Sequence, residues 1–233
     1  MELKGIKLTW LGHSTFRVET PGGKTVFIDP WVMGNPMCPE KEKNVKKADV
    51  LLCTHGHGDH IGDAVEIARK HDPVVVGIYE LALWMEKKGA KNIAPMGKGG
   101  TQTVGDIKVT AVHAEHSDGL EDGDQITYGG GACGYVVEFS YGIKIYHAGD
   151  TNVFGDMQII RELYAPDIAM LPIGGHFTMG PREAAYACKL LQPKMVIPMH
   201  FGTFPVLTGK PSDLQKLVPN IQVREMKPGE TLQ

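Results

Sequence analysis

The sequence predicts an α/β fold in one domain over residues 1–233, with strands inside and helices outside. Short apolar runs bounded by Gly, Pro and Asp alternate with longer segments of helical periodicity. The composition, 42% hydrophobic and 22% charged over 233 residues, is typical of a globular protein with a sizeable core. The sequence shows no tandem repeat, low-complexity tract or linker that would divide the chain.

In the first half, apolar runs and turn residues predict five strands and two helices. The strands are expected at residues 5–11, 14–19, 25–28, 49–54 and 74–76, and the helices at 61–70 and about 79–88. The second helix is expected to stop at Gly89. The Pro- and Lys-rich segment 31–47 is expected to cross the surface as a loop.

The second half continues the same mixture of elements. Strands are expected at residues 107–111, 135–139, 144–147, 168–171, 195–198 and 221–225, and helices within 154–163 and at 181–191 and 212–217. Pro181 suits the first turn of its helix, where no backbone N–H is needed. Residues 117–131 are rich in Gly and Asp and are expected to form a solvated loop at the border of a cleft.

Charge and cysteine usage exclude several classes of protein. With 24 Lys+Arg against 27 Asp+Glu, the formal net charge is −3, which argues against a dedicated nucleic-acid binder and a polybasic membrane module. The four cysteines are far apart, which is typical of a reduced protein without a disulfide framework. The charged N-terminus lacks a signal-peptide core. We therefore expect a cytoplasmic protein with a small-molecule partner, and the sequence leaves homo-oligomerisation open.

The ten histidines carry the functional signal, since all but His71 fall at or near the ends of expected strands. The strongest motif is THGHGDH at residues 54–60, between an expected buried strand and an expected helix. Imidazole and carboxylate ligands suit zinc, iron, manganese or nickel. Alternate residues of an extended segment point the same way, so His55 and His57 are expected to bind one ion. Asp59 and His60, turning into the helix, are expected to face a second ion.

The pattern His-x-His-x-Asp-His at residues 55–60 resembles the signature of the metallo-β-lactamase superfamily. The resemblance covers nearly the whole chain and implies a four-layered αββα sandwich. Further motifs that carry it are LTWLGHS at residues 8–14, Asp29-Pro30, YHAGDT at 146–151 and IPMH at 197–200. More narrowly, FGDM at 154–157 and LPIGG at 171–175 are similar to a family of metal-dependent hydrolases related to ascorbate-6-phosphate lactonase and N-acyl-phosphatidylethanolamine phospholipase.

Position by position, the resemblance implies two groups of ligands and a bridge. The first ion would be bound by His55, His57 and a middle histidine, the second by Asp59, His60 and His200, with Asp150 bridging both. His113 and His116 both offer the middle ligand, and His116 is preferred because Ala114 stands two places before it and Ser117 follows. Asp29 is expected to orient a ligand or cap a turn. His13 and His147 are expected either to support ligands from behind or to be satisfied strand-end histidines.

The implied cofactors are two divalent ions, with zinc favoured and manganese, iron or nickel also compatible with the ligands. They would share a hydroxide that attacks a small ester, lactone or phosphodiester. Asp59 is the expected catalytic residue that orients this water or accepts its proton. His176, in a Gly-rich turn, either donates a proton or hydrogen bond to the substrate oxygen or has a structural role. Five aromatic and apolar residues near the motifs are candidates to line a small-molecule pocket, although most of them are expected simply to pack: Trp31, Met33, Phe177, Phe201 and Phe204.

Two alternatives belong to other functional classes. A nuclease or RNA-processing phosphodiesterase of the same superfamily usually carries an added domain or a basic surface, and this chain shows neither. A non-catalytic metal-binding protein would be indicated by the loss of Asp59 or Asp150, and both are present.

Overall fold

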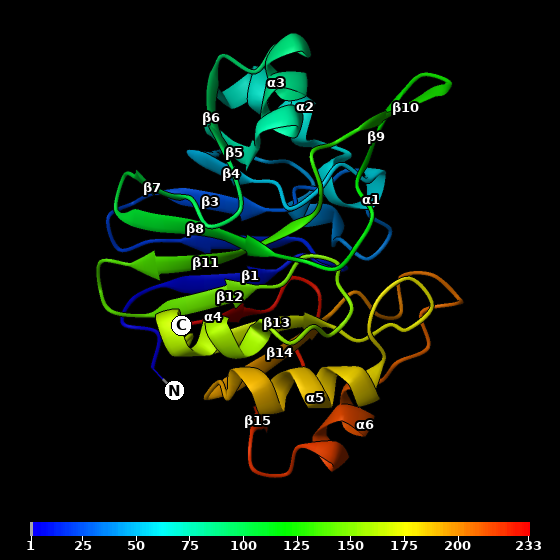
Figure 1. The fold of residues 1–233 in the computed structure, drawn as a ribbon. Coiled ribbons are helices and arrows are strands. Elements are labelled where there is room, and N and C mark those ends of the chain that lie inside the picture. Colours follow the sequence, from blue (N-terminus) through cyan, green and yellow to red (C-terminus); the bar gives the residue numbers. More distant parts are fainter. Residues whose placement is uncertain (1) are drawn as a thin grey trace.

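Two seven-stranded sheets pack face to face in this computed structural model, which describes residues 2–233 (Figure 1). The first sheet has the order β16-β1-β2-β3-β4-β5-β6. Its strands are β1 (Lys7–Trp10), β2 (Phe16–Glu19), β3 (Thr25–Ile28), β4 (Val50–Leu52), β5 (Val74–Ile78), β6 (Asn92–Met96) and β16 (Thr231–Leu232).

The second sheet has the order β15-β14-β13-β12-β11-β8-β7. Its strands are β7 (Thr101–Val104), β8 (Ile107–His113), β11 (Cys133–Phe139), β12 (Lys144–His147), β13 (Ile168–Pro172), β14 (Met195–Met199) and β15 (Gln222–Val223). A separate antiparallel hairpin, β9 (Gly119–Asp122) and β10 (Gln125–Tyr128), projects from the body of the molecule (Figure 1).

Helices cover the two outer faces of the sheets. They are α1 (Gly58–Ile61), α2 (Ala64–His71), α3 (Tyr79–Lys87), α4 (Met157–Tyr164), α5 (Pro181–Leu191) and α6 (Pro211–Leu217), with a 3₁₀ turn, η1, at Glu40–Glu42. The first sheet is covered by α2 and α3, and the second by α4 to α6 (Figure 1). This arrangement confirms the predicted α/β fold, a four-layered αββα sandwich.

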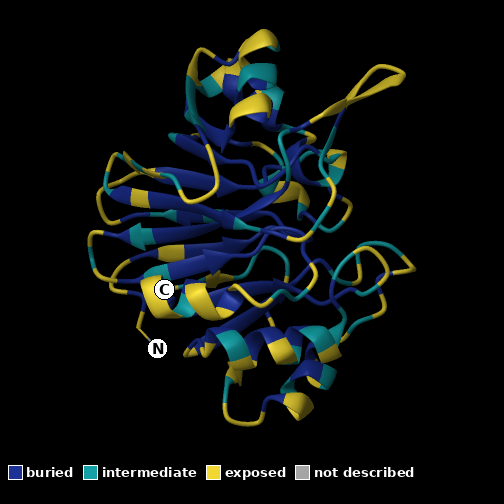
Figure 2. Ribbon diagram, viewed as in Figure 1, coloured by how far each residue is buried: buried dark blue, intermediate teal, exposed yellow. Residues whose placement is uncertain are grey.

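The strand sequences explain why each sheet can be covered on both faces. In β3, Val26 and Ile28 point into the core between the sheets, whereas Phe27 belongs to the cluster under α2 and α3. In β4, Leu52 belongs to the core between the sheets and Leu51 to the cluster under α2 and α3. Successive side chains of a strand point to opposite faces, so a run that is apolar throughout is buried on both. Figure 2 shows the result, with strands buried and the outer surfaces of the helices exposed.

The chain direction places the histidine-bearing segments at one end of both sheets. Strands β3, β4 and β5 run parallel in the first sheet, and β12, β13 and β14 run parallel in the second. The carboxyl ends of parallel strands meet at one edge, where α/β proteins carry their sites. The segments after β4, β12 and β14, which contain His55, Asp150 and His200, therefore converge there.

Several local predictions are corrected by the structure. The segment 117–131, expected as a loop, contains the β9–β10 hairpin, whose backbone is paired although its sequence is rich in turn residues. The single helix expected at 61–70 is split into α1 and α2, and the strand expected at 221–225 contains only Gln222–Val223. Strands β6, β7 and β16 were not predicted, because their short segments lack an apolar alternation that marks a strand.

All four cysteines are buried and free, as their dispersed positions predict. Within residues 2–233, no helix has the length and the apolar character that crossing a membrane requires.

Candidate metal centre

Three histidines form a first cluster of ligands. His55 and His57 follow β4, and His116 follows β8 on the opposite sheet. One ring nitrogen of each lies within 4.8 Å of those of the other two, and His55 Nε2 is 3.0 Å from His57 Nδ1. The structure places His116, and not His113, beside the other two. The side chain of His113 is 42% exposed and its Nε2 lies 3.3 Å from a Glu115 carboxylate oxygen.

A second cluster lies next to the first, around the carboxylate of Asp150. His60 Nε2 is 3.2 Å from Asp150 Oδ1, and His200 Nε2 is 2.9 Å from Asp150 Oδ2. His116 Nε2 lies 3.7 Å from the same Oδ2, so Asp150 touches members of both clusters. Asp59, His60 and His200 also gather with His13 within 4.8 Å.

The polar atoms of the second cluster fit a cation better than they fit each other. His60 Nε2, Asp150 Oδ1 and His200 Nε2 are buried and have no hydrogen-bond partner among the described residues, although they lie close together. Buried polar groups without partners are costly and rare in native proteins. Imidazole nitrogens and carboxylate oxygens that converge without hydrogen bonds are the donors that divalent transition metals bind. The residues present therefore fit a divalent metal ion.

Asp29 is hydrogen-bonded to both ends of residues 54–60, the segment that we call the metal loop. One of its oxygens accepts a hydrogen bond from the Thr54 N–H at 2.8 Å, and the other contacts the Thr54 hydroxyl and His60 Nδ1, each at 2.7 Å. The carboxylate thus turns His60 Nε2 toward Asp150, which is the orienting role predicted for Asp29.

His13 lies under Asp59 and is fully buried. Its Nε2 is 3.1 Å from Asp59 Oδ2, and its Nδ1 is 2.8 Å from the Thr203 hydroxyl. Burial lowers the pKa of His13 to about 4, against the opposing hydrogen bond with Asp59. Since an ionised carboxylate can only accept, the neutral imidazole donates its Nε2–H to Asp59. His13 therefore leaves one oxygen of Asp59 free for a metal.

His147 supports the turn before Asp150 through two hydrogen bonds to the backbone. Its Nε2 donates to the Ser14 carbonyl at 3.0 Å, and its Nδ1 accepts the Gly149 N–H at 3.1 Å. Gly149 has φ +62°, and a Cβ there would lie 2.7 Å from the Cys133 carbonyl oxygen. These contacts fix the turn that delivers Asp150.

The electrostatics separate the two clusters. Burial lowers the pKa of both His55 and His116, so these two imidazoles are neutral near pH 7. Burial opposes charge on His60 too, but the Asp150 and Asp29 carboxylates outweigh it and raise its pKa well above the ordinary value. Burial also opposes charge on Asp150, yet His200 and His60 hold its pKa well below the ordinary range.

Four residues around the clusters have backbone angles that favour glycine. His13, Asp29, His176 and His200 have φ values of +54°, +48°, +45° and +54°. Such conformations are disfavoured for residues with a Cβ and persist where the surroundings enforce them, often at functional sites.

An open pocket of about 460 Å³ leads to the clusters. Its lining residues are His57, Gly58, Asp59, His116, Ser117, Glu121, Asp150, Phe177 and His200. The predicted catalytic residue Asp59 is among them, whereas His176 is exposed and does not line the pocket. Its neighbour Phe177 does, with its ring 4.4 Å from that of His176. Glu121 was missed as a site residue, because only the acidity of its segment pointed toward the cleft.

The comparisons with known proteins agree with this geometry. A family model described as "Beta-lactamase superfamily domain" matches residues 7–200. A UPF0173 metal-dependent hydrolase of Koribacter versatilis is 68% identical over 231 residues, covering 99% of both chains. The chain belongs to the metallo-β-lactamase superfamily, in its UPF0173 family of metal-dependent hydrolases.

Other members of this superfamily support the assignment. A UPF0173 metal-dependent hydrolase of Solibacter usitatus is 49% identical and covers 98% of this chain and 100% of its own. Among solved structures, Igni18, a metallo hydrolase from the archaeon Ignicoccus hospitalis, superposes with a TM-score of 0.85 at 38% identity, covering 97% of both chains.

Proposed function

We propose that this UPF0173 hydrolase binds two divalent ions, zinc being favoured, and hydrolyses a small ester, lactone or phosphodiester. His55, His57 and His116 would hold one ion, and Asp59, His60 and His200 the other, with Asp150 shared. The observation that carries the proposal is the position of Asp150, whose carboxylate lies within 3.7 Å of ring nitrogens from both clusters. Two ions bound this way would lower the pKa of a shared water and polarise a substrate oxygen.

The roles of the protein's own residues follow from their surroundings. Burial acts to raise the pKa of Asp59, but the hydrogen bond from His13 and the nearby His60 outweigh it. The pKa of Asp59 therefore lies well below its ordinary value, and the carboxylate is ionised at neutral pH. A general base works best when its pKa lies near the working pH. We therefore assign Asp59 to orienting the reacting water rather than to taking its proton. The pocket volume of about 460 Å³ supports a small-molecule substrate.

The resemblance of residues 154–157 and 171–175 to a family related to a lactonase and a phospholipase supports all three classes, ester, lactone and phosphodiester. We propose no nucleic-acid or membrane partner. The nuclease alternative lacks a basic surface at this pocket, since none of its described lining residues is Lys or Arg.

Metal analysis of the purified protein tests the proposal. After reconstitution with zinc or manganese, the wild-type protein should bind about two ions per chain and cleave p-nitrophenyl esters. The Asp150→Asn variant should bind at most one ion and lose more than about 100-fold in kcat, because the bridge between the clusters is weakened. Asp156→Asn, an exposed carboxylate at the start of α4, is the matched control. One ion or none in the reconstituted wild-type protein would contradict the binuclear mechanism.

A further inference from the structure

We propose that the pocket selects uncharged or amine-bearing substrates over anionic ones, and that Glu121 on β9 is the residue that makes this selection. The inference rests on the proposed hydrolase function and narrows its substrate class. It predicts that the protein prefers neutral esters and lactones to phosphodiesters as substrates.

The β9–β10 hairpin is fixed at its base against the metal loop. Gly56, between the ligands His55 and His57, donates its N–H to Asp118 Oδ1 at 2.8 Å. Leu120 is only 1% exposed and belongs to the core cluster under α2 and α3. Asp122 pairs with Lys88 of α3 at 2.7 Å. These contacts hold β9 in place, while all of β10 is exposed (Figure 2).

Strand alternation then directs Glu121 toward the pocket. Because Leu120 points into the core, its neighbour Glu121 points the opposite way. Glu121 Oε2 lies 4.0 Å from the position that a Cβ on Gly58 would occupy. Gly58 separates the ligands His57 and Asp59, so the Glu121 carboxylate lies over the metal loop and lines the same pocket.

Apart from the two metal ions proposed above, no cationic side chain among the described lining residues matches the charge of Glu121. The nearby Lys88 pairs with Asp122 instead. Proteins that recognise phosphate or carboxylate groups use Arg or Lys side chains to do so, and none lines this pocket among residues 2–233. Asp59 and Asp150 also line it, but both are placed to bind metal. Glu121 therefore remains as a free negative charge facing the substrate.

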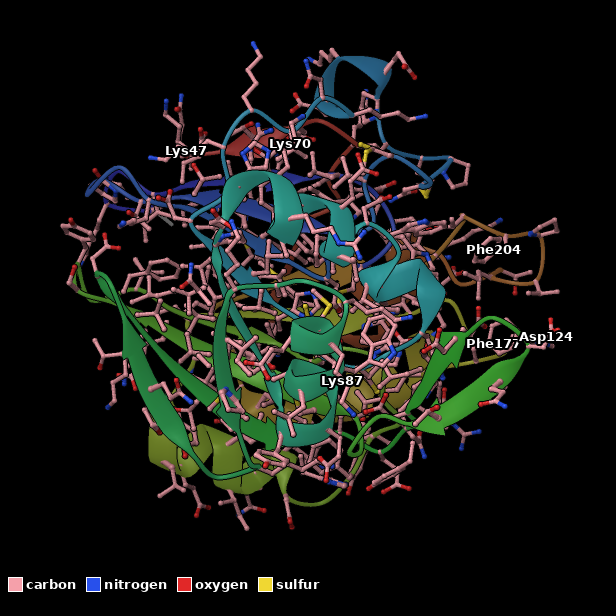
Figure 3. All side chains as sticks on the ribbon, turned by 90° about the horizontal axis from the view of Figure 1, so that it is seen from above. Lys47, Lys70, Lys87, Asp124, Phe177 and Phe204 are labelled. Carbon is pink, nitrogen blue, oxygen red and sulfur yellow. The ribbon has the colours of Figure 1, made fainter. Side chains whose placement is uncertain are left out.

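Phe177 lines the same pocket as Glu121. Its side chain is 57% exposed, and in Figure 3 Phe177 and the hairpin residue Asp124 lie at the same end of the molecule. A pocket lined by both an exposed aromatic ring and a carboxylate suits a substrate with an apolar group and either no charge or a positive charge.

The test compares two esters that differ in one terminal group, p-nitrophenyl butyrate with a methyl group and mono-p-nitrophenyl succinate with a carboxylate. The measurement is the ratio of their kcat/KM values with the zinc-loaded protein. Wild-type protein should prefer the butyrate, and Glu121→Gln should raise the relative kcat/KM of the succinate by about 5- to 10-fold. That change is expected for removing one charge about 6 Å from the anion at an effective dielectric constant of about 40. Asp124→Asn, at the hairpin tip, removes the same charge outside the pocket and should leave the ratio unchanged.

A binding measurement separates this inference from the proposed function. Glu121→Gln should bind inorganic phosphate at least about fivefold more tightly than wild type by calorimetry, whether or not either ester is turned over. Equal ester ratios and equal phosphate affinities in wild type, Glu121→Gln and Asp124→Asn would overturn the charge selection and leave hydrolysis intact. A wild-type protein that binds no metal and cleaves neither ester would instead overturn the proposed function.

Discussion

At the scale of single residues, the proposed metal ligands are held by buried neighbours that need not bind metal themselves. His60 is oriented by Asp29, and Asp59 by His13. Partners of this kind fix the tautomer and direction of a ligand, and removing one typically weakens metal binding 10- to 100-fold. The precision of the site therefore depends on residues well outside the His-x-His-x-Asp-His motif.

Replacing His13 by Ala tests this dependence. The variant should bind the second ion about 10- to 100-fold more weakly, because Asp59 loses the donor that holds its Oδ2. Competition with a chelator measures the affinity. His113→Ala, at a strand-end histidine outside both clusters, should bind both ions normally. An unchanged affinity in His13→Ala would show that Asp59 needs no such support.

Proton release on metal binding tests the difference between the clusters. Because its pKa is raised, His60 carries a proton near pH 7 in the metal-free protein, and this proton must leave when a metal binds. Affinity at the second cluster should therefore fall as the pH decreases, throughout the range below the pKa of His60. His55 and His116 have lowered pKa values, so these two ligands should release no proton when a metal binds above about pH 6.5.

Calorimetry in buffers with different ionisation enthalpies measures this release. More protons should be released as the second ion binds than as the first binds, because the proton of His60 leaves only at the second step. Equal release at the two steps would contradict the assignment of the charged histidine to the second cluster.

At the scale of elements, the β9–β10 hairpin is the most unusual feature. An isolated two-stranded hairpin is marginally stable in water, so its position depends on attachment to the rest of the molecule. Leu120 provides that attachment, because it packs where Gly56 has no side chain. A Cβ on Gly56 would lie 2.6 Å from Leu120 Cδ2.

Leu120→Ala should therefore destabilise the protein by about 2–5 kcal/mol, the range for removing a buried leucine side chain. Denaturant unfolding monitored by circular dichroism measures the loss. Ile126→Ala on the same hairpin is the matched control. Its side chain is 79% exposed, so the change should stay within about 0.5 kcal/mol. Similar effects of both substitutions would mean that the hairpin is not anchored through Leu120.

At the scale of the whole molecule, the ligands come from both sheets of the sandwich. His55 and His60 follow strand β4 of the first sheet, whereas His116, Asp150 and His200 follow strands of the second. A metal bound between them links the two layers in the folded state only, and such binding stabilises the fold by mass action.

Removing metal should consequently lower Tm. At a free metal concentration of about 100 times Kd, the stabilisation is about 2.7 kcal/mol, which corresponds to roughly 5–11 °C for a chain of this size. Differential scanning calorimetry with and without a chelator measures the shift. Asp150→Asn should show a clearly smaller one, and an equal shift in that variant would argue against Asp150 as a shared ligand.

The sequence by itself determined the α/β class, because apolar runs and turn residues are local patterns. The four layers and the seven expected ligands came from a family resemblance that short motifs carry, and four of those ligands lie in THGHGDH at residues 54–60. His116, Asp150 and His200 were assigned through motifs at strand ends, and the structure brings them to the same place.

Only the tertiary structure decided the choices that depend on distant contacts. His113 and His116 are equivalent as residue types, and the path of the chain after β8 alone puts His116 near His57. The hairpin at 117–131 forms because Leu120 and Asp118 find partners across the fold, which no local propensity encodes. Glu121 reaches the pocket, and His13 reaches Asp59, for the same reason: their partners are more than forty residues away in sequence.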